Sequence, residues 1–141
     1  MDDAERFEIL LERIEELRAR NEEEPIVVEG LRDIASLRSL GMEGHIIPIN
    51  SGVPLFQVAE AISQQADAII LLTDWDAKGQ TLFEALRTAL LANGVKVDGE
   101  VRLDLRHAIR PTIPDVESLA SYVQRGLERF HGKDLADHFG S

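Results

Sequence analysis

Two aspartates that follow a strongly apolar segment are the residues of this sequence best suited to chemistry. Asp74 and Asp76 come directly after the apolar run at 68–73, and residues two apart in an extended backbone point to the same side. Two carboxylates held so close repel one another, and a divalent cation between them allows both to stay ionised. The spacing therefore predicts half of a magnesium site, with Mn²⁺ as the alternative cation for such oxygen ligands.

A third carboxylate occupies the equivalent place after another short apolar run. Glu29 follows residues 26–28 and precedes Gly30. In an open parallel sheet, ligands bind beyond the carboxyl ends of the strands, where the strand order reverses. If the strands before Glu29 and Asp74 are neighbours there, Glu29 joins the aspartates in one catalytic metal site. It would act as a general acid or base, or complete the coordination shell of a second ion.

The elements that must position these acids alternate along the chain. Apolar or alternating runs predict strands at 25–28, 45–49, 68–73 and 101–105. Helical spacing and end signals predict helices at 3–20, 33–40, 54–65, 78–93 and 115–130. This order predicts the α/β class: an open, mostly parallel four-stranded sheet with helices on both faces and with 68–73 in a central position.

Three parts of the chain are expected from this pattern. Residues 1–24 form an N-terminal amphipathic helix, residues 25–110 the core, and residues 111–141 a C-terminal helix and tail. The first helix is expected to pack on its own domain, and the alternative is that it contacts a second copy or another protein.

Composition excludes several classes of protein. The 141 residues suffice for one domain, and the absence of cysteine excludes disulfides and thiolate metal sites. No apolar run approaches the ~20 residues that cross a bilayer, so we expect a cytoplasmic protein without membrane contact. The net charge of −11 argues against tight, metal-free binding of nucleic acid. Ten acids and four bases in residues 1–24 account for −6 of that charge, which leaves weak, metal-dependent contact open.

The two acidic motifs together resemble a known family. A Glu-Gly turn after the first strand, followed later by a hydrophobic strand that ends in Asp-x-Asp-x-x-Gly, is similar to the Toprim domain of topoisomerases and bacterial-type primases. The similarity covers roughly residues 25–106, and it is closest to small stand-alone Toprim proteins and to the Toprim domain of the ribonuclease that matures ribosomal RNA. The resemblance implies a Toprim-like, Rossmann-like fold, Mg²⁺ as cofactor and nucleic acid, RNA or DNA, as partner. Family members often have a lysine after the Glu-Gly pair, whereas this chain has Leu31 and then Arg32.

Several residues near the predicted crevice are candidates for contact with substrate phosphates. The turn at 50–52 can expose backbone N–H groups, and arginines can bind phosphate in a forked geometry. Asp33 is alternatively a helix cap or an arginine partner, and Asp76 is alternatively a helix cap. The candidates are Gly30, Arg32, Asp33, Asn50, Ser51, Lys78, Arg102 and Arg106.

These observations favour a magnesium-dependent phosphoryl-transfer enzyme that acts on nucleic acid, either a small Toprim nuclease or an RNA-processing factor. The second hypothesis is a non-catalytic module that uses the acidic site for metal-dependent docking to nucleic acid or protein. A phospho-acceptor receiver domain is a third, but receivers need an acidic pair after the first strand, where this chain has only Glu29.

Overall fold

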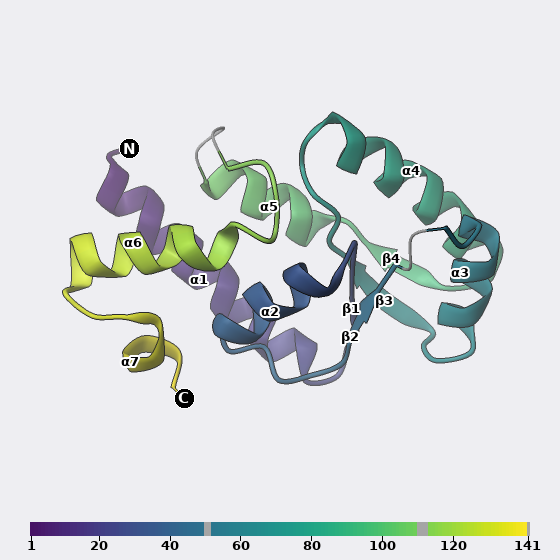
Figure 1. Cartoon of the computed structure of the whole chain (residues 1–141), viewed down its shortest axis with the longest axis horizontal. Coiled ribbons are helices and arrows are strands. Elements are labelled where there is room, and N and C mark those ends of the chain that lie inside the picture. The colour runs from purple at the N-terminus through teal and green to yellow at the C-terminus, as the bar shows by residue number, and fades with distance from the viewer. Residues whose placement is uncertain (50–51, 110–112, 141) are drawn as a thin grey trace.

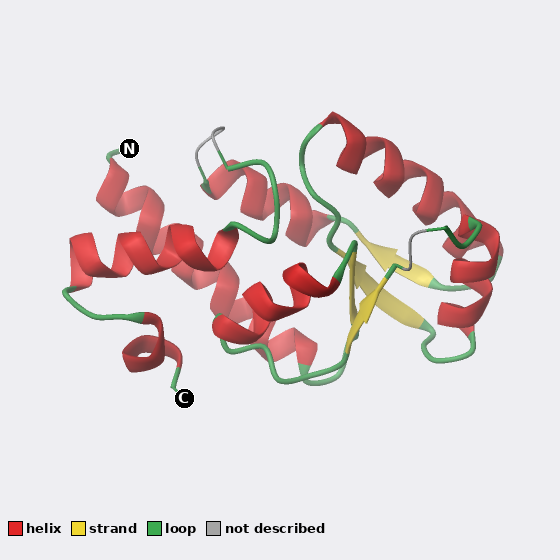
Figure 2. Ribbon diagram, viewed as in Figure 1, coloured by secondary structure: helices red, strands yellow, loops and turns green. Residues whose placement is uncertain are grey.

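Four parallel strands form one sheet, and helices cover both of its faces (Figures 1 and 2). The computed structural model describes residues 1–49, 52–109 and 113–140. The elements in chain order are α1 (Asp3–Asn21), β1 (Ile26–Val28), α2 (Leu31–Ser39), β2 (Ile46–Pro48), α3 (Leu55–Ser63), β3 (Ala68–Leu71), α4 (Ala77–Ala92), β4 (Lys96–Asp98), α5 (Glu100–Ala108), α6 (Leu119–His131) and α7 (Leu135–Phe139).

The strand order is β2-β1-β3-β4, and every neighbouring pair is parallel. Ile26 of β1 is in register with Ile46 on one side and with Ile70 on the other. The chain runs outward from β1 to β2, then returns past β1 to β3, so the order reverses between β1 and β3. Glu29 and Asp74 therefore follow the two strands that flank the reversal, and the predicted α/β fold with β3 inside the sheet is confirmed.

Alternating side chains of the strands divide the core between the two faces of the sheet. Val28 and Ile70 belong to a cluster with α1, α2, α5 and α6. Val27 and Ile69 belong to a second cluster with α3 and α4. Strands that are covered on both faces consist of continuous apolar residues, which is why β1 and β3 were recognisable in the sequence.

The prediction of a fourth strand at 101–105 is wrong, because this segment lies in helix α5 and β4 is formed by Lys96–Asp98. Alternation of apolar and polar residues over five positions suggested a strand, but the buried residues Arg102, Leu105 and Ala108 follow a spacing of three, as on one face of a helix. In so short a segment the two periods overlap, and Leu103 is in fact exposed.

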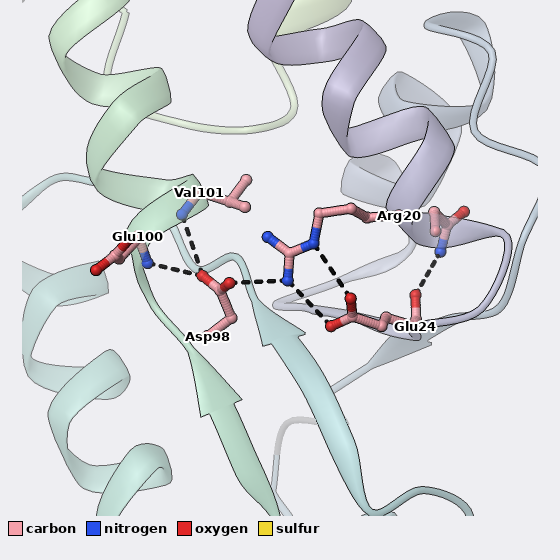
Figure 3. Close-up of polar contacts among 6 residues, drawn as sticks. Arg20, Glu24, Asp98, Glu100 and Val101 are labelled. Carbon is pink, nitrogen blue, oxygen red and sulfur yellow. Dashed lines mark hydrogen bonds and ion pairs between the residues drawn. The ribbon is translucent and has the colours of Figure 1, made fainter.

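Asp98 marks the junction of β4 and α5 and also connects it to the first helix (Figure 3). One carboxylate oxygen accepts the N–H groups of Glu100 and Val101, at 2.8 and 3.3 Å, and the other is 2.8 Å from the guanidinium of Arg20. Burial favours a higher pKa for Asp98, but the hydrogen bonds from Arg20 and from these two N–H groups lower the pKa on balance. This carboxylate is therefore held ionised at the start of α5, where the helix dipole favours a negative charge.

The N-terminal helix packs on its own domain, as the first of the two alternatives predicted. Its apolar face is buried against α5 and the sheet, through Phe7, Leu10, Leu11, Ile14 and Leu17. Contact with a second copy or another protein stays a prediction. At the other end of the chain, α6 begins later than predicted, and the expected tail contains the short helix α7, whose Phe139 joins the same cluster. None of the helices within the described residues is long and apolar enough to span a membrane.

Candidate functional site

Glu29 and Asp74 meet at the carboxyl ends of β1 and β3. The backbone N–H of Asp74 donates to Oε2 of Glu29 at 2.7 Å, although the two residues are 45 positions apart. Since β1 and β3 are adjacent and parallel, both acids leave the sheet at the same edge. The predicted convergence of these two residues is therefore present in the fold.

Residues 113–116, which precede α6, contact this point through three hydrogen bonds. The N–H of Val116 donates to Oδ1 of Asp74 at 2.9 Å, and the N–H of Trp75 donates to the carbonyl of Pro114 at 3.0 Å. The indole N–H of Trp75 donates to the carbonyl of Ile113, and the ring is only 8% exposed. Trp75 therefore packs into the protein.

Asp33 adds a third negative charge beside this pair. It accepts the N–H of Gly30 at 3.0 Å, so the alternative of a helix-capping role is correct. Burial raises the pKa of Asp74 to about 7; the Val116 N–H opposes this shift, and the charges of Glu29 and Asp33 add to it. The pKa of Asp33 is also raised, again by burial first.

Asp76 caps helix α4 and does not join the other two aspartates and Glu29 in a closed cluster. Its Oδ1 accepts the N–H of Gly79 at 2.7 Å, and its side chain is exposed. Across residues 1–49, 52–109 and 113–140, no three histidine or acidic side chains are grouped so that they could hold a metal ion as they stand. The metal role of Asp76 stays a prediction, and the structure supports the capping alternative for one of its oxygens.

A buried arginine fixes the backbone on either side of Asp74. Arg102 is 4% exposed and lies in helix α5, so the prediction that places it in a strand at 101–105 is wrong. Its guanidinium donates to the carbonyls of Thr73 and Asp74 and to the side chain of Gln80, at 3.1, 2.7 and 2.7 Å. Burial lowers the pKa of Arg102, while the charges of the nearby acids Glu29, Asp74 and Asp76 work to raise it.

The remaining predicted contacts are distributed around this centre. Arg32 is largely exposed and lies 3.4 Å from a carboxylate oxygen of Glu117, and both Lys78 and Arg106 are exposed. Their contact with a substrate stays a prediction. Asn50 and Ser51 lie outside the described residues.

The glycines of the two motifs differ in whether a side chain would fit at their position. A Cβ at Gly79 would lie 1.9 Å from the carbonyl oxygen of Asp74, so the backbone of α4 approaches that carbonyl closely. Gly30 has an extended backbone with φ −156°, and a Cβ there would meet nothing within 4 Å. The close approach therefore requires glycine at position 79, whereas the backbone at position 30 does not.

Replacing Gly79 with alanine should lower the free energy of unfolding by about 2–3 kcal/mol, even though alanine favours helices. The added methyl group would push α4 away from Asp74, because a backbone carbonyl cannot move aside. The measurement is urea denaturation. Gly30→Ser, at an open N-cap where serine is favoured, is the control and should be neutral within about 0.5 kcal/mol. Equal stability of the two variants would contradict the close approach.

Two residues have a role at the site that the sequence did not reveal. Arg102 resembles any charged residue of an amphipathic segment, and Val116 contributes only its backbone N–H. A correct assignment of 100–108 as helix would have placed Arg102 on the same face as Leu105, which is the one pattern that could have revealed its burial.

Comparisons with known proteins agree with this geometry. Residues 23–98 match the family model of the Toprim domain. The chain is 42% identical over 122 residues to a UPF0292 protein of Methanocaldococcus jannaschii, covering 86% of this chain and 94% of that protein. It is 38% identical over 130 residues to a UPF0292 protein of Pyrococcus horikoshii, covering 92% of this chain and 93% of that protein.

Among solved structures, a putative protein from Aquifex aeolicus shares the fold with a TM-score of 0.65 and 27% identity, over 76% of this chain and 94% of that one. The resemblance predicted from the Glu-Gly and Asp-x-Asp motifs is thereby confirmed. The chain therefore belongs to the Toprim domain family and to the UPF0292 proteins.

Proposed function

We propose that this Toprim protein is a magnesium-dependent phosphodiesterase that cleaves nucleic acid. Membership of the family indicates a metal-dependent function connected with nucleic acid. The observation that carries the finer proposal is the contact between Glu29 and Asp74 across the strand-order reversal, with the pKa of Asp74 raised by burial and by its acidic neighbours. Perturbed acids at such a point are typical of functional sites.

The residues present suit a hard divalent cation. No basic side chain in the described ranges forms an ion pair or hydrogen bond with the carboxylate of Glu29 or Asp74, so no direct contact of that kind within those ranges offsets their repulsion. Mg²⁺ keeps several waters and is commonly held by only one or two carboxylates together with substrate phosphates. Glu29 and Asp74 would hold it, with Asp76 as the predicted third ligand through the oxygen that does not cap α4. The lack of a closed three-residue cluster is thus compatible with magnesium.

The chain's own residues have distinct parts in this proposal. Oε2 of Glu29 accepts the N–H of Asp74. The other carboxylate oxygen of Glu29 would accept a proton from an attacking water or complete the coordination shell of the metal. Asp74 is oriented by the Val116 N–H, and Arg102 holds the carbonyls on either side of it. Magnesium, when bound, neutralises the scissile phosphate and stabilises the leaving oxygen. Residues 25–110 would form this catalytic core, with 1–24 and 111–141 as flanking parts.

A non-catalytic module is the second candidate, and it is favoured by the observation that no three metal-binding side chains are grouped together within the described residues. Such a protein would use Glu29 and Asp74 for metal-dependent docking to nucleic acid or protein. It would bind without changing the covalent structure of its partner.

Cleavage at stoichiometric protein concentration separates the two candidates. We expect Mg²⁺ or Mn²⁺ to support cutting of at least one member of a panel of structured RNAs and DNAs, and EDTA to stop it. The products are resolved on denaturing gels. If the panel stays intact with both metals while a labelled member binds in a metal-dependent way, the docking module is correct and the enzymatic proposal fails.

A further inference from the structure

A hollow lined by arginines lies between α1 and α6. Arg6 comes from α1, and Arg125 and Arg129 come from α6, which lies across α1 in Figure 1. We call this site the arginine hollow. Its volume is about 200 Å³, and Ile113 forms part of its wall.

The positions of these residues follow from helix geometry. Tyr122, Arg125, Gly126 and Arg129 are spaced by three or four residues, so they share one face of α6. A Cβ at Gly126 would lie 2.1 Å from the ring of Phe7, so glycine lets the two helices approach closely here. The close approach places the arginines of both helices around one depression.

The charge of the arginine hollow contrasts with that of the whole chain. Three arginines and Asp3 line it, which gives a local charge of +2 in a protein of net charge −11. Arg129 is 3.6 Å from a carboxylate oxygen of Asp3, an exposed pair of small energetic value. Arg6 and Arg125 form no ion pair with any residue in the described part of the chain. Two arginines are therefore available for an anion.

The lining and size of the hollow indicate the kind of anion. Phe7, Phe130 and Tyr122 also line it, and the rings of Phe7 and Phe130 contact one another with centroids 5.5 Å apart. Guanidinium groups next to aromatic rings are the combination that binds the phosphates and stacks the sugars or bases of single-stranded nucleic acid. A volume of about 200 Å³ is below the ~300–1,000 Å³ of pockets that enclose whole small molecules. It suits one phosphate group with part of its nucleotide.

One segment connects this hollow to the acidic pair. Ile113 lines the hollow and its carbonyl accepts the Trp75 indole N–H, while Val116, three residues on, donates to Asp74. Three residues span at most ~11 Å, so the nearer wall of the hollow lies close to the site at which we propose cleavage. A strand that occupies one site can therefore extend toward the other.

We propose that the arginine hollow binds a backbone phosphate of the nucleic acid substrate at a distance from the bond that is cut. The proposal rests on the proposed function, since it assigns the anchoring of that substrate to Arg6, Arg125 and Arg129. It explains how a strongly acidic protein can hold a polyanion, because the phosphate contacts are gathered at one locally basic site.

The test compares the double variant Arg6→Gln/Arg125→Gln with a control of equal charge change, Arg13→Gln/Arg87→Gln. Arg13 is half-buried on α1 like Arg6, and Arg87 is exposed on a helix surface like Arg125. Binding of fluorescent uridine and thymidine homopolymers is measured by anisotropy over a salt series with Ca²⁺ in place of Mg²⁺. We expect about a tenfold loss of affinity and a shallower salt dependence, by roughly 0.7 per lost phosphate contact, in the first variant only.

Two further arms identify the phosphate and separate the outcomes. Equal binding of strands with and without a 5′-phosphate indicates an internal diester, whereas dependence on it, with competition by inorganic phosphate, indicates a terminal one. Unchanged affinity in the double variant, an equal loss in the control, or no binding of any probe by the unaltered protein overturns the anchor. If strands bind to the unaltered protein but stay uncut with Mg²⁺, the proposed cleavage fails while the anchor does not. The two proposals can therefore be told apart.

Discussion

Replacing Asp74 with asparagine, or Glu29 with glutamine, is expected to reduce cleavage by about 10²–10⁴-fold in Mg²⁺ without unfolding the protein. Both substitutions keep an oxygen that can accept the N–H now bound, from Val116 in one case and from Asp74 in the other. Each removes the charge that a cation and a phosphoryl transfer require. The measurement is the single-turnover rate on whichever RNA or DNA of the panel is cut.

The same Asp74→Asn variant should be more stable than the unaltered protein at alkaline pH when metal is absent. The carboxyl has a pKa of 3.8 in the unfolded chain and about 7 in the fold, so the fold binds its proton more tightly. Stability therefore falls as pH rises from about 4 to 7, and the full penalty is present above pH 7. Asparagine at position 74 carries no charge, so the variant is not destabilised in this way at high pH.

We expect a gain of about 1–3 kcal/mol at pH 8, after allowance for solvent screening, and little gain near pH 4. Thermal denaturation across this range measures it, with exposed Asp104→Asn as the control that should change stability by less than about 0.5 kcal/mol. Mg²⁺ should raise the melting temperature of the unaltered protein and have less effect on Asp74→Asn. A variant that cleaves normally, or that gains no stability at pH 8, would contradict the role given to this carboxylate.

The comparison of sequence and structure shows which features could be predicted and why. β1 and β3 were recognisable because both are buried on two faces and are therefore apolar throughout. The meeting of Glu29 with Asp74 followed from a topological rule, since neighbouring parallel strands end at one edge of the sheet. The site was predictable to the extent that strand ends determine it.

What could not be predicted depends on contacts between distant helices. The packing of helix α5 in the fold brings the guanidinium of Arg102 to the carbonyls of Thr73 and Asp74. The sequence of residues 100–108 alone does not specify that contact. The capping of α4 by Asp76 was one of two open alternatives, because aspartate serves as helix cap and as metal ligand with similar ease. The arginine hollow needs α1 and α6 side by side, although α1 ends at Asn21 and α6 begins only at Leu119.

Arg102 connects the stability of the fold to the geometry of the site, and its loss is the second change expected to have a large effect. Two of the three hydrogen bonds of its guanidinium satisfy the carbonyls of Thr73 and Asp74 and the third goes to Gln80, and its side chain also lies over the ring of Phe83 at 5.0 Å. Arg102→Met would fill much of the volume but leave both carbonyls without their donor. We expect the free energy of unfolding to fall by about 3–5 kcal/mol.

A lysine at this position tests whether the forked guanidinium or only its charge is required. Lysine cannot span the Thr73 and Asp74 carbonyls and the Gln80 side chain with the same planar geometry, so Arg102→Lys should lose at least about 1–2 kcal/mol and slow cleavage. Because this residue acts through Asp74, its variants should weaken Mg²⁺ binding in titration calorimetry as well as stability. Arg106→Met, one turn further along α5 and exposed, is the matched control and should change neither. If Arg102→Lys binds metal and unfolds like the unaltered protein, the guanidinium does not position the aspartate loop, and the link between α5 and the site must be abandoned.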